Sequence, residues 1–215
     1  MSAMRGLFLV IFFGVAHLWV VIAWASDPGV SQDSLRAFTN KLAGISQYQA
    51  RFSQVTRDAM GEVLQEQQGT LLAKRPNRFV WRTAAPYNQA IISNGETVWI
   101  MDDDLEQVTV QALDKDMANT PALLLGGSIE EIQNSFEVSS VGSGREIYLL
   151  KPKANEALFS SLQVSFEDNR LVSMILVDHL DQRMEIRFTD IEVSPVFSEG
   201  VFQPTIPPGY DVIEQ

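Results

Sequence analysis

Residues 70–100, TLLAKRPNRFVWRTAAPYNQAIISNGETVWI, decide the fold of this chain. They predict three short strands that are rich in aromatic residues, with Trp81 and Trp99 inside strands, around a corner that Pro76 fixes. A sheet that carries such large rings on one face must have that face covered. The cover is the protein's own core, a helix or an apolar ligand, and the function depends on which of these it is.

Further strands are predicted on both sides of this stretch. Asn94-Gly95 is a strong signal for a two-residue hairpin, and apolar and polar residues alternate in much of the flanking sequence. The runs lie at 48–52, 63–73, 78–82, 91–92, 98–99, 107–111, 136–141, 146–151, 162–166, 171–177 and 184–188. About ten strands joined by tight turns, with one sheet face polar, predict a meandering antiparallel sheet that curls or closes.

The first predicted helix covers residues 31–43. Leu35, Phe38 and Leu42 recur there at spacings of three and four, which places them on one apolar stripe. Gly44 is a candidate stop signal. A helix with such a stripe must bury it, and the aromatic sheet is the available partner.

The insert 114–132 is the second predicted helical segment. Thr120 is a candidate cap, and Pro121 suits the first helical position. The run Leu123-Leu124-Leu125 is too apolar to lie in water, so the insert must lie on the sheet. Two helices on one curled sheet predict a mainly β (α+β) fold, an unclosed antiparallel β-barrel of about ten to eleven strands covered by a helical lid.

The first 25 residues predict export. Arg5 precedes an apolar run, and small residues at Ala23 and Ala25 fit a secretory signal peptide cleaved after Ala25. The alternative is an uncleaved anchor, since about 18 apolar residues suffice to span a bilayer. Cleavage leaves residues 26–215, which we expect to form one domain without a second domain or a long linker.

Charge and cysteine content exclude several functions. The formal net charge is −11, and loss of Arg5 makes the mature chain more negative still. No basic patch replaces phosphate counterions, which argues against a nucleic-acid partner. The chain has no Cys, which excludes thiol catalysis, disulfide exchange and acylation at an N-terminal Cys. Export without an acyl anchor indicates a soluble protein of an extracytoplasmic compartment, most simply a bacterial periplasm.

No group of residues indicates an enzyme, a metal site or a cofactor. His179 is the only His after residue 25 and lies between two predicted strands, where a polar turn is expected. The run Asp102-Asp103-Asp104 suits a solvated hairpin loop and lacks the spacing of a calcium-binding loop. The nucleophile motif G-x-S-x-G is absent.

Arg75 and the aromatic residues each allow two interpretations. Arg75 is either an ordinary surface residue at a turn or a donor whose guanidinium reaches helix carbonyl groups at the edge of the lid. Phe79 and Trp81 share one face of their strand, and Trp99 and Met101 share one face of theirs. These side chains are either packed core or the wall of a cavity that two short helices do not fill.

The motifs taken together resemble the outer-membrane lipoprotein carrier protein family, the LolA-type periplasmic chaperones. The resemblance extends over essentially the whole mature chain and rests on the order of the segments. They are Phe52-Ser53-Gln54, Lys74-Arg75-Pro76-Asn77 with Phe79 and Trp81, 93–99, Glu106-Gln107, Asn119-Thr120-Pro121, 149–153, Asp181-Gln182-Arg183 and Pro207-Pro208-Gly209.

The resemblance implies a carrier with an unclosed, helix-covered barrel. In the family, an inner-membrane ABC transporter releases acylated lipoproteins to the carrier, which crosses the periplasm and passes them to an outer-membrane receptor; we expect a monomer. By the same resemblance, Arg75 is the gate of the lid, and Phe79 is an aromatic residue important for transfer. The expected acyl-chain cavity and lid comprise Leu35, Phe38, Leu42, Phe52, Phe79, Trp81, Trp99, Met101, Pro121, Leu123, Leu124 and Leu125.

Two functions of other classes compete with this interpretation. One is an open-barrel regulatory domain that senses lipids or lipoproteins as a signal. The other is an extracytoplasmic hydrolase, for which a nucleophile with its base is missing from the sequence.

Overall fold

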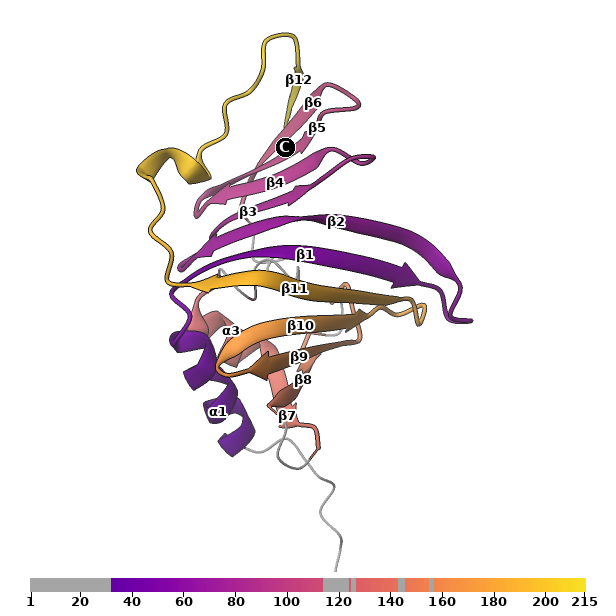
Figure 1. Ribbon diagram of the computed structural model, residues 1–215, viewed down its shortest axis with the longest axis vertical. Helices are drawn as coiled ribbons and strands as arrows, with labels where there is room; N and C mark the ends of the chain where they lie inside the picture. Colours follow the sequence, from indigo (N-terminus) through magenta and orange to yellow (C-terminus); the bar gives the residue numbers. More distant parts are fainter. Residues whose placement is uncertain (1–31, 114–123, 125–126, 143–145, 155–156) are drawn as a thin grey trace, which may run out of the picture.

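The computed structural model describes residues 32–113, 124, 127–142, 146–154 and 157–215. The predicted signal peptide lies outside these residues, as does most of 114–126. The described strands form one twelve-stranded sheet with two free edges, so the barrel is not closed (Figure 1). The predicted mainly β, unclosed fold is therefore confirmed, with one strand more than expected.

The helices and strands follow one another in a simple order along the chain. Their bounds are α1 Gln32–Ala43, β1 Gln47–Arg57, β2 Val63–Lys74, β3 Arg78–Thr83, β4 Gln89–Asn94, β5 Thr97–Asp102, β6 Gln107–Ala112, α3 Ile129–Ser135, β7 Phe136–Ser140, β8 Ile147–Pro152, β9 Ser161–Glu167, β10 Arg170–Val177, β11 Arg183–Val193, the 3-10 helix η2 Glu199–Phe202 and β12 Asp211–Glu214. Across the sheet the order is β12-β6-β5-β4-β3-β2-β1-β11-β10-β9-β8-β7.

Two antiparallel meanders make up most of this sheet. β1–β6 form the first and β7–β11 the second, and β11 pairs with β1 to join them. In that pairing Phe52 lies across from Phe188, so the aromatic residues of the two meanders share one face. The period-two pattern of the sequence is the reason: alternate residues of β1 are buried, while those between them are exposed or half-buried.

The β4–β5 hairpin differs from the predicted turn by one residue. Asn94 ends β4, and the loop consists of Gly95 and Glu96. The Asn94 Oδ1 accepts hydrogen bonds from the amide groups of Glu96, at 2.9 Å, and Thr97, at 2.8 Å. Gly95 has a φ of 102°, a conformation that favours glycine. Asn94 thus acts as a side-chain acceptor and not as a central residue of the turn.

The C-terminal segment contains a strand that the sequence did not predict. β12 runs parallel to the edge strand β6, with Val212 across from Val108. All four residues of β12 are exposed, so no alternation of apolar and polar residues marks it. Sequence analysis therefore missed this pairing.

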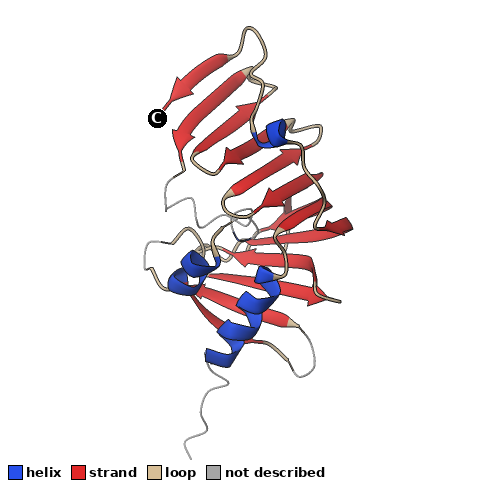
Figure 2. Cartoon of the chain, turned by 90° about the vertical axis from the view of Figure 1, so that its left-hand side faces the viewer, coloured by secondary structure: helices blue, strands red, loops and turns tan. Residues whose placement is uncertain are grey.

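α1 and α3 lie side by side against the half of the sheet that carries β7–β10 (Figure 2). The stripe predicted for α1 is confirmed, because Phe38 and Leu42 are fully buried and Leu35 packs partly buried beside them. The second helical prediction, 114–132, falls only partly on the described residues, where Leu124 is helical and 129–132 belong to α3. α3 begins at Ile129, with Ser128 as its N-cap, and continues to Ser135, whereas Thr120 lies outside the described residues.

The sheet has two faces, each with its own hydrophobic cluster. We call the face covered by α1 and α3 the inner face; it holds Phe79, Trp81 and the larger cluster. The outer face carries a smaller cluster that includes Trp99 and is covered by residues 194–210, the C-terminal strap. Figure 1 shows the strap (yellow) leaving the end of β11, forming η2 beside β3 and β4, and returning to β12.

Candidate functional site

The inner face is the candidate functional site. Its cluster combines buried side chains of both meanders with those of α1 and α3. Most of the predicted site residues that the structure describes belong to it. They are Leu35, Phe38 and Leu42 of α1, Phe52 of β1, Phe79 and Trp81 of β3, and Leu124.

Aromatic contacts show how closely the inner face is packed in this conformation. The Phe52 and Trp81 ring centroids are 4.2 Å apart. Phe38 of α1 packs against two rings of the second meander, with its centroid 5.2 Å from that of Tyr148 and 6.1 Å from that of Phe166. The helix is therefore seated on the sheet by an aromatic side chain that points into the cluster.

Trp99 and Met101 are not part of this site, contrary to the sequence prediction. Both lie in the outer-face cluster. The register explains the error: Trp99 pairs with Ile92, and Ile92 pairs with Val80. Paired residues point to the same face, and Val80 points away from its neighbours in sequence, Phe79 and Trp81. The sequence pattern gives the two faces of each strand but not which face matches that of the next strand.

Three further predicted residues, Pro121, Leu123 and Leu125, lie outside the described residues. Leu124, between the last two, is 3% exposed and belongs to the inner cluster. We use the word lid for α1 together with Leu124 and residues 127–135.

Arg75 connects the end of β2 to the lid. Its guanidinium donates hydrogen bonds to three backbone carbonyl groups: from Nε to Ile45 at 3.2 Å, from Nη2 to Leu124 at 3.0 Å, and from Nη1 to Gly127. Ile45 follows α1, and the other two acceptors precede α3. One side chain thus holds both helical parts of the lid, which matches the lid-contact interpretation of Arg75.

The charge of Arg75 is held in an unusual environment. The side chain is half-buried, and burial lowers the pKa of the guanidinium to about 10. The group is still protonated near neutral pH, so all of its N–H donors are present. Its partners in the described part of the chain are neutral carbonyl oxygens and not carboxylates. Such contacts can be exchanged for hydrogen bonds to water without leaving a carboxylate unpaired.

α3 is closed at its N-terminus by a capping box. The Ser128 Oγ accepts a hydrogen bond from the Glu131 amide at 3.1 Å, and the Glu131 carboxylate accepts one from the Ser128 amide at 3.3 Å. Ile132 of this helix is 4% exposed and lies in the inner cluster. The capping box therefore fixes the helix that follows directly after the carbonyl groups bound by Arg75.

Sequence reasoning missed several residues of the inner face. Tyr48 is fully buried, and its hydroxyl donates to the Leu171 carbonyl at 2.7 Å. Burial raises the pKa of Tyr48 above its ordinary value. The second meander contributes the rings of Phe136, Tyr148, Phe159, Phe166 and Phe188. The alternation in their strands was visible in the sequence, but nothing there linked that half to the aromatic corner at 70–100.

The residues considered for chemistry lie in turns. His179 Nε2 is 2.7 Å from the Ala157 carbonyl oxygen, in the connection between β10 and β11. Asp102 Oδ1 accepts hydrogen bonds from the amide groups of Asp104 and Leu105 in the β5–β6 turn. A hydrogen bond from Gln89, followed by that of Leu105, lowers the pKa of Asp102. Within the part of the chain that the structure describes, no cluster of three metal-ligating side chains occurs.

A search of the helices in the described ranges finds none with the length and apolar content needed to cross a bilayer.

Comparison with known proteins gives a consistent result. The family model described as "Outer membrane lipoprotein carrier protein LolA" matches residues 43–205. The chain is 42% identical over 204 residues to the outer-membrane lipoprotein carrier protein of Hahella chejuensis, covering 94% of this chain and 95% of that one. It is 40% identical over 206 residues to the protein of the same name from Pseudomonas paraeruginosa, covering 95% and 97%.

A solved structure has a similar fold. A LolA superfamily protein from Nitrosomonas europaea matches with a TM-score of 0.50 and 10% identity, covering 80% of this chain and 98% of that one. At this identity the likeness concerns the fold alone.

Proposed function

Since the chain belongs to the outer membrane lipoprotein carrier protein LolA family, we propose that it is a periplasmic chaperone that binds the acyl chains of lipoproteins and carries them between membranes. The observation that carries this proposal is the aromatic inner face under a lid whose parts are linked by one guanidinium. Such a face buries apolar chains, and the contacts of the guanidinium with neutral carbonyl oxygens break without loss of an ion pair, although lifting α1 would also break its Lys41–Glu146 ion pair.

The energetics of an acyl chain suit this arrangement. Each CH₂ that leaves water contributes about 0.8 kcal/mol, so an unprotected lipoprotein aggregates. A carrier must nevertheless release its cargo without ATP of its own. Hydrogen bonds of the kind Arg75 makes contribute about 1 kcal/mol each, more where the donor is charged. A lid held by three of them is stable when the carrier is empty and is displaced when acyl chains occupy the inner face.

The proposed acyl-chain site differs from the set expected from sequence. It retains Leu35, Phe38, Leu42, Phe52, Phe79, Trp81 and Leu124 and excludes Trp99 and Met101. Pro121, Leu123 and Leu125 stay in the proposal as lid residues on the strength of the family resemblance. Tyr148 and Phe166 are added, because Phe38 contacts both and must leave them when α1 lifts.

Arg75 is proposed as the gate of the lid. Opening separates its guanidinium from the carbonyl groups of Leu124 and Gly127, and withdraws Leu124 and Ile132 from the inner cluster. Acyl chains then replace the apolar contacts that the lid residues lose. In this proposal, acyl chains enter the inner face only when the hydrogen bonds from Arg75 to the lid backbone break.

The proposed partners follow from the family. The cargo is an acylated lipoprotein, supplied by an inner-membrane ABC transporter and delivered to an outer-membrane receptor. We propose that residues 1–25 are cleaved on export, that the mature protein acts as a monomer, and that it has no catalytic activity and needs no cofactor. The alternative of a sensing regulatory domain is not favoured, because relatives named as carriers align over nearly all of both chains.

Native mass spectrometry tests the proposal directly. The protein is incubated with spheroplasts that contain an acylated lipoprotein, and the released material is analysed. We expect a one-to-one complex with the acylated form and none with a form whose acylated Cys is replaced by Ser. Equal complexes with both forms, or none with either, would show that acyl chains are not the bound group.

A further inference from the structure

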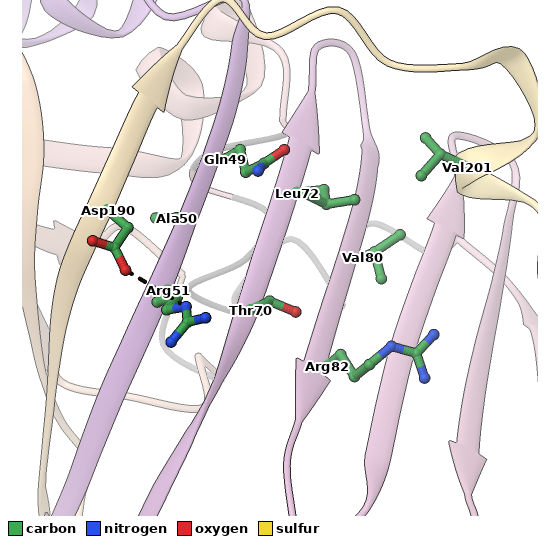
Figure 3. Close-up of a pocket in the computed structure, with 9 residues that line it drawn as sticks. All are labelled: Gln49, Ala50, Arg51, Thr70, Leu72, Val80, Arg82, Asp190 and Val201. Atoms are coloured by element: carbon green, nitrogen blue, oxygen red, sulfur yellow. Dashed lines mark ion pairs between the residues drawn. The ribbon is translucent and has the colours of Figure 1, made fainter.

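The outer face carries a pocket that the carrier function does not use. It has a volume of about 430 Å³ and lies on β1, β2 and β3, between Asp190 of β11 and Val201 of the strap (Figure 3). Except for Ala50, which belongs to the inner cluster, the strand side chains of β1, β2 and β3 drawn there lie on the opposite side of the sheet to Phe79 and Trp81. A ligand in this pocket is therefore separated from the inner face by the sheet itself.

Two rows of side chains form the pocket, and both run across the same three strands. In the first row, Arg51 pairs with Thr70, and Thr70 pairs with Arg82. In the second, Gln49 pairs with Leu72, and Leu72 pairs with Val80. The first row is cationic with a hydroxyl at its centre, and the second is largely apolar.

The cationic row is the unusual part of this acidic protein. The chain has 16 Lys and Arg against 27 Asp and Glu, yet this pocket holds two Arg and a single carboxylate. The Arg82 side chain makes no hydrogen bond or ion pair with any other described residue. Strands lie roughly 5 Å apart, so the two Arg backbones are roughly 10 Å apart. The Arg82 guanidinium points away from Thr70 in Figure 3, and a change of its side-chain rotamer would bring it toward Arg51 above Thr70.

Arg51 is only loosely neutralised. Its Nε lies 3.5 Å from the Asp190 Oδ2, and both side chains are 74% exposed. Guanidinium–carboxylate hydrogen bonds of full strength are shorter, at about 2.7–2.9 Å. Asp190 is therefore positioned beside the cationic row as a weak internal competitor for an incoming anion.

The apolar row continues into the outer cluster. Val80 belongs to that cluster, and Leu72 and Val201 pack against it partly buried. Val201 stands at the rim of the pocket, on the strap. A hydrocarbon chain lying over Leu72 and Val80 would therefore enlarge the outer cluster, which the strap already covers in part.

We propose that this pocket binds an anionic single-chain amphiphile, with its head group between Arg51 and Arg82 and its chain over Leu72 and Val80 against the strap. A phosphate or a carboxylate head accepts hydrogen bonds from both guanidinium groups and from the Thr70 hydroxyl. The site does not rest on the carrier function, because the side chains proposed to hold the ligand lie on the opposite face of the sheet from the inner cluster.

Titration calorimetry with four probes tests the head and the chain separately. Dodecyl phosphate and dodecanoate carry both features, dodecyltrimethylammonium has the wrong charge, and inorganic phosphate has no chain. Each probe is used below its critical micelle concentration. We expect the two anionic amphiphiles to bind and the other two probes to bind far more weakly; comparing the two binders identifies the preferred head group.

Three variants locate the binding site. Arg82→Gln should lower the affinity for dodecyl phosphate about tenfold, because a charged hydrogen bond is lost. Arg78→Gln is the matched control: it removes the same charge from the same face of β3, outside the pocket, and should leave the affinity unchanged. Asp190→Asn should raise the affinity, since the competing carboxylate is removed. Equal effects of Arg82→Gln and Arg78→Gln would overturn the proposal.

The same titration is repeated on protein already loaded with lipoprotein, which distinguishes binding at the outer face from binding at the inner face. Unchanged binding supports the outer site, whereas loss of binding would mean that the probe occupies the inner face and would overturn the proposal.

Vesicles of anionic phospholipid provide the last test. If the protein binds these vesicles through Arg82 but does not bind single amphiphiles, the partner is a membrane surface, and this result would also overturn the proposal. If no lipoprotein complex forms at all, the variant series still decides the outer site.

Discussion

Phe52 of β1 and Gly69 of β2 are paired across the sheet, and the Phe52 ring occupies the space above Gly69. A Cβ at Gly69 would lie 2.7 Å from the Phe52 Cζ and would also overlap the Arg82 carbonyl oxygen. The missing side chain leaves room for the Phe52 ring over Gly69, where it packs against Trp81 with an interplanar angle of 32°. One glycine thus shapes the floor of the inner face.

Gly69→Ala should therefore destabilise the protein. The added methyl group meets backbone as well as the ring, and overpacking of this kind costs about 1–3 kcal/mol. The measurement is the midpoint of urea unfolding. Gly200→Ala is the control, because nothing lies within 4 Å of a Cβ there. An equal midpoint shift in both variants would contradict the packing argument.

Arg75→Lys should loosen the lid without unfolding the sheet. A Lys ammonium is a single point donor and cannot reach the Ile45, Leu124 and Gly127 carbonyl groups together. We expect amide hydrogen exchange in α3 to accelerate about tenfold, while exchange in β1 and β2 stays slow. Arg78→Lys, at an exposed position just beyond the same turn, serves as the control. Unchanged exchange in α3 would mean that the apolar contacts of Leu124 and Ile132 hold the lid.

The two tryptophans after residue 25 report on opposite faces. Trp81 lies in the inner cluster and Trp99 in the outer one, and the other two tryptophans of the chain fall in the predicted signal peptide. Protein purified from the periplasm is titrated with a triacylated lipopeptide whose acyl chains carry bromine. Fluorescence of the Trp99→Phe variant, which retains Trp81, should be quenched, and that of Trp81→Phe should not. Equal quenching would place the acyl chains elsewhere.

Tyr48 should make the protein sensitive to alkali. Burial is the main cause of the raised pKa of Tyr48, so the folded state keeps a proton that the unfolded state loses above about pH 10. The stabilisation from this group is complete below that pH and declines as the pH rises. Tyr48→Phe should cost about 1 kcal/mol near neutral pH, because the bond to Leu171 is lost. It should also reduce the decline in unfolding free energy between about pH 9 and pH 11. A decline as steep as in the unchanged protein would contradict this assignment.

The sequence predicted what depends on periodicity and turn residues. The α1 stripe, the β1 alternation and the open sheet with a helical cover follow from local patterns, and the structure has all of them. The contacts of Arg75 with backbone carbonyl groups of the lid also match one of its two interpretations. Its role in gating is still a prediction.

The features that sequence analysis could not predict depend on the register between paired strands. Trp99 and Phe79 both alternate correctly within their own strands, yet the pairing through Ile92 puts Trp99 on the outer face. A shift of one residue between strands moves a whole set of side chains to the other side, and no local pattern fixes that shift. β12 was missed for a related reason, since its pairing with β6 leaves no buried residue to mark it.

The pairing of β1 with β11 also has a consequence for how the chain reaches its folded state. Tyr48 pairs with Val193, so the seam between the two meanders joins residues near opposite ends of the sequence. Contacts of such high sequence separation form slowly, because the intervening loop must close first. During N-terminal-first translocation, the Phe52 side of β1 therefore emerges long before the strand that completes it. On the export and the acyl-chain site proposed above, the newly exported polypeptide would pass through a stage in which the proposed lipid-binding face is exposed and prone to aggregate until β11 has emerged.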